Sequence, residues 1–246
     1  MRIRFRVEYL GTPFNGWQKQ PNTSETIQAY VERALKTTLR IPVDIIGSGR
    51  TDTGVHAYGQ MAHADLDLDD VDPKKLQKSL NGILPSSIAI REMQKCSDDF
   101  HARFSALERY YIYRIRTRKT VLDASTSWEY IKFPIDVDRV KETALHFAGT
   151  HDFNAFSMPR NDGRNTLCTL KPIEIVSTDH SIDFHIVGNR FLHGMIRSLV
   201  GCMVESGKGR WKPGDTPAAL LQNIASPRIW APPIGLTLQD VVYDES

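Results

Sequence analysis

The chain contains few cysteines, and their positions indicate neither a disulfide framework nor a metal site. Cys96, Cys168 and Cys202 are the 3 cysteines among 246 residues, and they lie far apart. The 8 histidines form no His-x-x-x-His pair, and the sequence has no Cys-x-x-Cys grouping of the kind that binds zinc. We therefore expect no bound metal.

Long hydrophobic runs are also missing. No stretch approaches the roughly 18 uninterrupted apolar residues that mark a membrane-spanning helix, and no signal peptide is evident, so we expect a soluble, cytoplasmic protein. Apolar residues make up 41% and charged residues 24% of the chain, which are ordinary globular values. The length is sufficient for one large domain or two of ordinary size.

Charge of one sign is not in excess, because the formal net charge is only +2. Arginine and lysine nevertheless cluster in three places, at residues 2–6, 109–119 and 208–212. Such stripes are compatible with binding to nucleic acid, and they are equally compatible with solvated faces of the protein.

One glycine-rich stretch organises the rest of the chain. Residues 47–57 read GSGRTDTGVHA, between a short apolar run at 43–46 and an alternating segment at 60–68. This context predicts a strand, a tight loop and a second strand. The loop holds Arg50 and Asp52 between glycines, which permit positive φ and close approach of another chain segment. It can therefore present a reactive side chain on a rigid, exposed ledge.

The loop allows several interpretations. It can be a polar hairpin in which Arg50 and Asp52 are simply solvated. A phosphate-binding Walker loop is disfavoured because no lysine follows the second glycine. The tripeptide Asp52-Thr53-Gly54 also occurs in aspartic proteases, where two such carboxylates share a proton. This chain has one such tripeptide, so a hydrolase of that type would have to be a homodimer.

Hydrophobic periodicity predicts two successive βαββαβ halves. In the first, strands are expected at 2–10, 43–47, 59–68 and 88–93. One helix begins at Thr23 or Ser24 and ends at Pro42, and a second opens at Pro73. In the second half, strands are expected at 108–118, 170–177, 182–188 and 236–243. Helices begin at Asp136 or Asp138, at 191 (ending at 206) and at Thr216, and 149–168 reads as a functional loop.

This order indicates an α+β fold made of two ferredoxin-like halves, residues 1–105 and 106–246. We expect largely antiparallel sheets side by side, with helices covering one face and a cleft between the halves. In the helix at 191–206, His193, Arg197 and Gly201 follow each other at intervals of four residues, and Gly194 lies beside them. They form a stripe separate from the leucines.

Six motifs, in order over essentially the whole chain, resemble those of the tRNA pseudouridine synthases of the TruA type. The first two are Tyr9-x-Gly11-x-x-Phe14-x-Gly16-Trp17-Gln18 and Gly49-Arg50-Thr51-Asp52-x-Gly54-Val55-His56-Ala57. The next two are Phe100-His101-Ala102-Arg103-Phe104-Ser105-Ala106, running into Arg109-x-Tyr111-x-Tyr113, and His151-Asp152-Phe153-x-x-Phe156. The last two are Phe191-Leu192-x-x-Met195-Ile196-Arg197-x-x-Val200-Gly201 and Ala231-Pro232-Pro233-x-Gly235-Leu236-x-Leu238.

The resemblance implies an isomerase that converts uridine to pseudouridine in the anticodon arm of tRNA, at positions 38, 39 and 40. It implies a homodimer in which Asp52 is the nucleophile and Arg50 helps to hold the RNA with its target base turned out. Tyr111 then lies against the flipped uracil, Arg197 pairs with Asp52, and Leu236 packs beneath the base. Further RNA contacts are expected from the following residues: Arg103, Arg109, His151, Phe156 and His193.

The chemistry agrees with this assignment. The reaction breaks N1–C1′ and joins C5 to C1′, which needs a nucleophile and no cofactor. A base within an RNA stem must also be extruded and stacked on an aromatic ring, a role that Tyr111 can fill. A non-catalytic RNA-binding protein of two ferredoxin-like units is the alternative, but it would leave a pairing of Asp52 with Arg197 unexplained.

Overall fold

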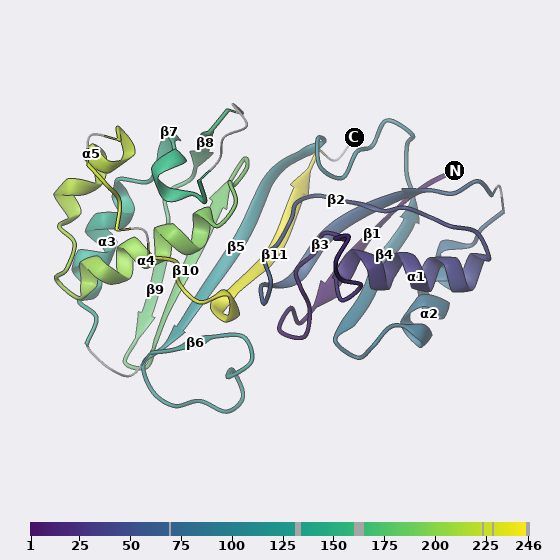
Figure 1. Cartoon of the computed structure of the whole chain (residues 1–246), viewed down its shortest axis with the longest axis horizontal. Helices are drawn as coiled ribbons and strands as arrows, with labels where there is room; N and C mark the ends of the chain where they lie inside the picture. Colours follow the sequence, from purple (N-terminus) through teal and green to yellow (C-terminus); the bar gives the residue numbers. More distant parts are fainter. Residues whose placement is uncertain (69, 131–133, 160–164, 223, 228, 245–246) are drawn as a thin grey trace. The chain divides into compact units, whose positions relative to one another are not determined.

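The computed structural model describes residues 1–68, 70–130, 134–159, 165–222, 224–227 and 229–244. These residues form a mixed α+β structure with five α-helices and mostly antiparallel strands (Figure 1). The chain divides into two compact units: unit 1 comprises Met1–Leu107 and Thr237–Ser246, and unit 2 comprises Glu108–Leu236. The units thus differ from the predicted halves in the C-terminal strand, whose residues from Thr237 onward group with unit 1.

Unit 1 has the βαββαβ order expected from the sequence. Its elements are β1 (Arg2–Tyr9), α1 (Ile27–Leu39), β2 (Ile46–Gly47), β3 (His56–Asp65), α2 (Pro73–Ile83) and β4 (Ile88–Lys95). β1 lies between β4 and β3 and is antiparallel to both. The other edge of β3 is shared, because β2 pairs with its C-terminal part and β11 (Leu236–Tyr243) pairs in parallel with its start. The apolar residues of β1 alternate with arginines and are buried, as its pattern predicts.

The ends of α1 differ from the prediction. The N-cap is Thr26, whose hydroxyl accepts a hydrogen bond from the Ala29 N–H at 3.4 Å. Thr23 instead accepts the Glu25 N–H within the preceding turn. The helix stops before Pro42, at a left-handed Arg40 (φ 64°) whose N–H bonds back to the Lys36 carbonyl. The predicted opening of α2 is confirmed: Pro73 is its first residue, behind an Asp72 N-cap.

Unit 2 contains more strands than the sequence predicts. Its strands are β5 (Ala106–Arg116), β6 (Trp128–Glu129), β7 (Gly149–Asp152), β8 (Leu167–Leu170), β9 (Glu174–Thr178) and β10 (Ser181–Gly188). The order is β5-β10-β8-β7, with β6 on β5 and β9 on β10. β7 and β8 occupy both ends of the predicted 149–168 loop, whose residues 160–164 lie outside the described residues. The strand predicted at 170–177 is two strands, because Pro172 falls between β8 and β9 and cannot donate to a ladder.

The helices of unit 2 are α3 (Val137–Leu145), α4 (Met195–Gly207) and α5 (Thr216–Leu220). The helix expected from residue 191 starts at Met195, because Gly194 adopts a left-handed conformation (φ 70°) at its N-cap. α4 is buried along almost its whole length, and α3 packs against its C-terminal end. There the Thr143 hydroxyl donates to Ser206 at 2.7 Å, inside the core. Among the described residues, no helix combines the length and apolarity needed to cross a membrane.

Candidate active site

The segment that joins β2 to β3, residues 48–55, is here named the Asp52 loop. Its first arm is fixed to β3, because the Ser48 N–H donates to the Met61 carbonyl at 2.8 Å. The buried Gln60 side chain completes this attachment: its oxygen accepts the Ser48 hydroxyl at 2.5 Å, and its nitrogen donates to the Gly49 carbonyl at 2.9 Å. The loop therefore leaves the sheet on a defined path.

The apex of the loop rests on residues 11–18, here named the bracing loop. Thr51 is held from two sides, since its hydroxyl is 2.8 Å from the Tyr9 hydroxyl and its carbonyl accepts the Trp17 N–H at 3.1 Å. Gly16 (φ 82°) lies so close that a Cβ there would be 2.8 Å from the Thr51 carbonyl oxygen. The indole of Trp17 is 2% exposed and lies against Gly47, where an added Cβ would be 2.6 Å from the ring. The residue before Asp52 is thus immobilised.

The second arm is closed by a turn and a buried histidine. The Val55 N–H donates to the Asp52 carbonyl at 3.1 Å, and Gly54 supplies the positive φ (80°) that this turn requires. His56, 2% exposed, accepts the Gly11 N–H on Nδ1 at 3.0 Å. An accepting Nδ1 belongs to a neutral ring with its proton on Nε2. Thr51 on one side of Asp52 and Val55 and His56 on the other are therefore buried and hydrogen-bonded, whereas Asp52 itself is half-buried at the protein surface.

Arg50, the other charged residue of the loop, has an exposed side chain. Its Nε–H donates to Oε1 of Gln18 at 3.1 Å. The bracing loop therefore contacts both the main chain beside Asp52 and the side chain of Arg50.

Arg103, a predicted RNA contact, lies in a tight turn after β4. His101 organises this turn, because its Nδ1 accepts the N–H groups of Arg103 and Phe104 at 3.1 and 3.2 Å. The Arg103 guanidinium lies 5.6 Å from the centre of the Phe104 ring, which is 77% exposed. The turn is anchored to β3 by the Ala102 N–H, which donates to His63 Nδ1 at 3.1 Å. Unit 1 thus presents an arginine and an exposed aromatic ring on a fixed turn.

Burial lowers the pKa of His63 to about 4, and the neighbouring His101 and Arg2 act in the same direction. Asp65 opposes the shift less strongly. His63 is 2% exposed, so its ring is a neutral acceptor that keeps the turn attached.

In unit 2, Tyr111 lies on β5 and is 7% exposed. The edge of its ring meets Phe191 at a centroid distance of 5.3 Å. Tyr113, two residues on and therefore on the same face of the strand, donates its hydroxyl to the Pro232 carbonyl at 2.8 Å. Burial raises the pKa of Tyr113 well above its usual value, against the opposing charge of Arg197. β5 thus places Tyr113 against the motif that begins at Ala231.

Arg197, on α4, is half-buried and bound to the same motif. Its Nε–H donates to the Ala231 carbonyl at 2.7 Å, and the Ala231 N–H donates to the Arg197 carbonyl at 3.0 Å. One turn further, Gly201 admits the chain at Ile229, since an added Cβ would be 1.9 Å from that carbonyl oxygen. In the predicted His193–Arg197–Gly201 stripe, Gly201 is therefore needed because only a residue without a side chain lets residues 229–231 pack this close to α4.

Leu236 lies within this motif, at the start of β11, and is 5% exposed. The preceding Gly235 lies against the Tyr113 ring, where an added Cβ would be 2.7 Å from the nearest ring carbon. The structure therefore brings Arg197, Tyr113 and the segment leading to Leu236 together within unit 2.

Two other predicted RNA contacts make hydrogen bonds within unit 2. The Arg109 guanidinium on β5 donates to the Asn189 carbonyl at 2.6 Å, and its side chain is half-buried. His151 on β7 is 2.8 Å from the Ala148 carbonyl through Nε2. Both side chains are oriented by the protein's own backbone.

The last two predicted contacts differ in exposure. His193 is exposed in the turn just before α4. Phe156 is 0% exposed and packs edge-to-face with Phe147 at a centroid distance of 5.2 Å. An aromatic ring inside the core has no surface to offer to RNA, so the sequence pattern at Phe156 reflects packing.

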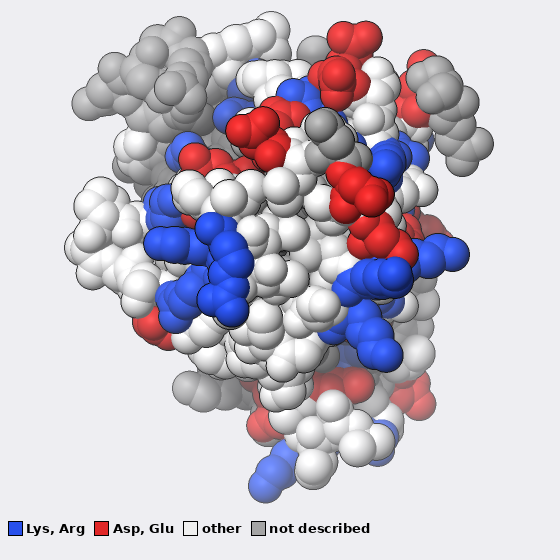
Figure 2. All heavy atoms as spheres, turned by 90° about the vertical axis from the view of Figure 1, so that its right-hand side faces the viewer, with Lys and Arg blue, Asp and Glu red and all other residues white. Residues whose placement is uncertain are grey.

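Two of the three arginines of the first strand, Arg2 and Arg6, are engaged by carboxylates. Arg2 pairs with Asp65 at 2.7 Å, and Arg6 pairs with Glu92 at 2.7 Å and also with Asp240. On the face seen in Figure 2, lysines and arginines gather in separate groups with mostly uncharged residues between the largest of them, and acidic side chains lie mainly above these groups. Arg2 and Arg6 are thus tied into ion pairs that cross the unit 1 sheet, whereas the Arg4 guanidinium lies over the Phe100 ring.

A family model described as tRNA pseudouridine synthase matches residues 6–105 and 143–244. The chain belongs to the tRNA pseudouridine synthase family. The tRNA pseudouridine synthase A of Burkholderia multivorans is 39% identical over 250 residues, covering 99% of this chain and 90% of that protein. The corresponding enzymes of Bradyrhizobium sp. and Ehrlichia canis are 38% and 35% identical, covering 98% and 99% of this chain and 99% and 100% of their own lengths.

Among solved structures, an H/ACA RNP bound to a substrate RNA containing 2'-deoxyuridine aligns with 82% of this chain and 44% of its own chain. Its identity is 12% and its TM-score 0.40, too low to add to the family assignment.

For this member of the tRNA pseudouridine synthase family, the sequence did not single out the residues that support the site. Thr51, His56, Gln60 and Tyr113 each make a buried contact that fixes a loop beside a predicted site residue. The sequence feature that could have identified these four residues is their position within or beside the family motifs. Among the described residues, no cluster of histidine, cysteine, aspartate and glutamate could hold a metal ion.

Proposed function

We propose that the chain isomerises uridine to pseudouridine at positions 38, 39 and 40 of tRNA, with Asp52 as the nucleophile and no cofactor. One observation carries the proposal: a half-buried carboxylate stands on a loop held by the buried, hydrogen-bonded Thr51 on one side and by Val55 and His56 on the other. Such a loop holds a reacting group in place without further ordering, which is the main requirement when one carboxylate does the chemistry.

In the reaction, the Asp52 carboxylate attacks either C1′ of the ribose or C6 of the uracil. Either route releases N1 from C1′, after which the base rotates, C5 bonds to C1′, and the bond to Asp52 breaks so that the free carboxylate is regenerated. The C5 proton is then lost and N1 gains a proton, so the product is an isomer of the substrate. No oxidant, metal or second substrate enters this balance.

Residues of unit 2 complete the proposed site. Asp52 belongs to unit 1 whereas Tyr111, Arg197 and Leu236 belong to unit 2, and we propose that all act on the same uridine. Tyr111 lies against the flipped uracil and takes part in moving the C5 proton, and Leu236 packs beneath the base. Arg197 pairs with Asp52; its contact with Ala231 sets the direction of the guanidinium before RNA arrives.

The RNA backbone is bound by cationic side chains that carry no sequence information themselves. We assign Arg50, Arg103 and Arg109 to this role, with His151 and His193 beside them. Arg2 and Arg6 are left out because carboxylates already pair with them. Phe156 is also left out because it is a core residue.

The working form in this proposal is a homodimer in the cytoplasm, the compartment in which bacterial tRNA matures. The functional halves are residues 1–105, which carry the Asp52 loop, and 106–246, which carry Tyr111, Arg197 and Leu236.

The test uses unmodified tRNA transcripts that carry tritium at C5 of uracil. Incubation with the purified chain is expected to release tritium from transcripts with uridine at position 38, 39 or 40. Transcripts with cytidine at all three positions should release none. Binding without tritium release would support the non-catalytic alternative, and cleavage of peptide substrates at acid pH would support the aspartic hydrolase.

A further inference from the structure

A chain of side-chain amides connects Arg50 to the interior of unit 1. Its inner end is Glu32 on α1, which is 9% exposed. Oε2 of Glu32 accepts from Lys19 Nζ at 2.7 Å, and Oε1 accepts the Ile45 N–H at 3.2 Å and Gln28 Nε2 at 2.9 Å. A carboxylate paired with a lysine can only accept hydrogen bonds, so Gln28 must turn its NH₂ group towards it.

The orientation of Gln28 is therefore fixed. Gln28 is 8% exposed, and its Nε2 also donates to the Ile45 carbonyl at 3.1 Å. Its oxygen must then face the end of the bracing loop and the residue after it, where it accepts Gln18 Nε2 at 2.6 Å and the Lys19 N–H at 2.9 Å. The Gln28 amide is therefore fully hydrogen-bonded, with its nitrogen donating towards Glu32 and its oxygen accepting from Gln18 and Lys19.

The same logic fixes the next amide. Because Gln18 uses its nitrogen to bond Gln28, its oxygen faces outward, and that oxygen accepts Arg50 Nε–H at 3.1 Å. A reversed Gln18 amide would place its NH₂ group against a guanidinium and an oxygen against an oxygen. The series Glu32, Gln28, Gln18, Arg50, named the relay here, thus has a single direction.

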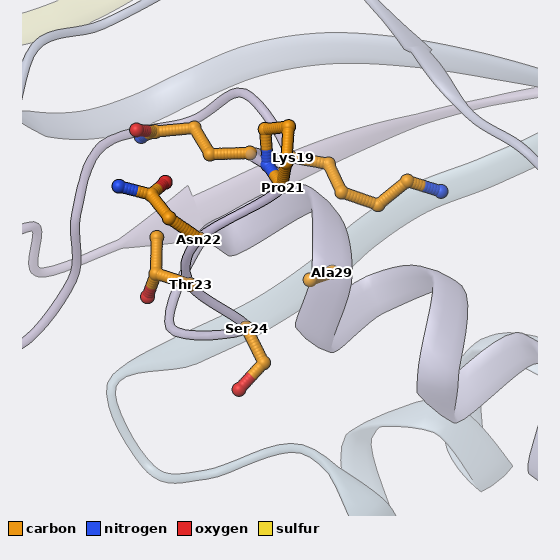
Figure 3. A pocket seen from close by; sticks show the side chains of 7 residues that line it. Lys19, Pro21, Asn22, Thr23, Ser24 and Ala29 are labelled. Carbon is orange, nitrogen blue, oxygen red and sulfur yellow. The ribbon is translucent and has the colours of Figure 1, made fainter.

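Lys19 anchors the inner end of the relay. Its pKa is raised because Nζ donates to Glu32, against the opposing effect of burial. Figure 3 shows the Lys19 side chain running away from Asn22, Thr23 and Ser24, which line an open hollow of about 450 Å³ with it. The Lys19 amine binds Glu32 on α1. Since Gln18 of the bracing loop also bonds to Gln28 on α1, the relay holds the bracing loop as well as Arg50.

We propose that Glu32, Gln28 and Gln18 are positioning residues that preset the Arg50 guanidinium for the RNA backbone beside Asp52. The inference rests on the proposed function, in which Arg50 holds the RNA with its target base turned out. A long, exposed arginine otherwise samples many rotamers, and ordering it on binding would lower affinity for the productive complex. The relay reduces this entropic cost because Gln18 holds the Nε–H of Arg50, which leaves the Nη groups of the guanidinium for the RNA.

The test compares Gln18→Met, which breaks the relay at similar volume, with Glu32→Gln, which removes the acceptor-only end. Asp44→Asn is the matched control, because Asp44 is an exposed second partner of Lys19 at 3.4 Å and lies outside the relay. Since the Arg50–Gln18 bond involves a charged group, kcat/KM for tRNA should fall about tenfold in Gln18→Met and about threefold in Glu32→Gln. Asp44→Asn should match the wild type.

Each substitution is then repeated in an Arg50→Gln background. A positioning role predicts that Gln18→Met and Glu32→Gln have no further effect there, because the residue through which they act is gone. If they lower kcat/KM by the same factor in both backgrounds, they act on stability or on another group and the proposal is wrong. Thermal unfolding of every variant shows which preparations are folded.

A second measurement does not depend on activity. The Arg50 Nε–H signal in ¹⁵N-labelled protein, assigned by its loss in Arg50→Lys, should exchange with water about tenfold faster in Gln18→Met than in wild type and Asp44→Asn. Equal exchange in all three would overturn the relay. If the wild type released no tritium from tRNA, the proposed function would fail while this measurement still decided the relay.

Discussion

Arg197 and Ala231 are joined twice. The Arg197 side chain donates to the Ala231 carbonyl at 2.7 Å, and the Ala231 N–H donates to the Arg197 carbonyl at 3.0 Å. One residue of α4 therefore holds the start of the motif that contains Leu236, through both its main chain and its side chain. A lysine would keep the main-chain bond and the charge but would lose the Nε–H donor.

We expect Arg197→Lys to lower kcat by about 10²-fold and Arg197→Met by about 10³-fold or more, the range found when a preorganised electrostatic contact is removed. Single-turnover tritium release measures this. Near-normal kcat in a folded Arg197→Met variant would show that Arg197 only anchors residues 229–231.

Asp52→Asn should abolish turnover while tRNA affinity stays within about threefold, because phosphate contacts supply most of the affinity. The amide preserves the shape of the side chain and lacks the nucleophile. Filter binding and tritium release on the same preparation separate the two quantities. Turnover at the wild-type rate would remove Asp52 from the mechanism.

Tyr111→Phe should keep tRNA binding and slow the chemical step, because the ring and its contact with Phe191 persist while the hydroxyl is lost. Tyr111→Ala should reduce both, since stacking of a base on an aromatic ring is worth roughly 1–3 kcal/mol. Should the phenylalanine variant turn over like wild type, Tyr111 is a stacking surface and the proton leaves by another route.

Gly201→Ala should destabilise the protein by about 1–3 kcal/mol, the usual cost of overpacking, because the new methyl group meets the Ile229 carbonyl. Gly214→Ala is the control, since no atom lies within 4 Å of its Cβ position. Urea unfolding gives the free energies. Because residues 229–231 would be displaced, Gly201→Ala should also lower kcat, and equal stability of the two variants would contradict the packing at Gly201.

His63 predicts how stability depends on pH. Its pKa is about 4 in the folded protein against an ordinary 6.5, so the unfolded chain takes up a proton first as the pH falls. The free energy of unfolding should therefore decrease as the pH falls from 6.5 to 4. Below pH 4, His63 should cause no further decrease. In His63→Asn, whose side-chain oxygen can still accept the Ala102 N–H, the decrease should be smaller. Identical pH profiles would mean that His63 does not titrate in this range.

The sequence predicted the fold of unit 1 well because local pattern determines it. Alternation in β1 and the Asp72-Pro73 start of α2 need only neighbouring residues. The start of α1 was predicted at Thr23 or Ser24 rather than at Thr26, because all three hydroxyl residues can cap a helix and Thr23 is instead used in the preceding turn. In unit 2, β7 and β8 were missed because each is four residues long and their pairing joins segments separated by a polar stretch.

Site residues divide in the same way. The motif indicated Asp52 and Arg50, but the contacts that fix them, such as Tyr9 with Thr51 and Gly11 with His56, join residues 42 and 45 positions apart. Buried polar partners of that kind carry no periodic signal. Phe156 shows the converse, because its motif position gave no information about its burial.

The indole of Trp17 gives the Asp52 loop an intrinsic optical reporter. This ring is buried against Gly47, and its main-chain N–H is bonded to Thr51, so any movement of the loop changes the surroundings of a fluorophore. The chain has 4 tryptophans, and the others, Trp128, Trp211 and Trp230, belong to unit 2. With those three replaced by phenylalanine, emission from Trp17 would follow unit 1 alone while RNA binds, without any added label.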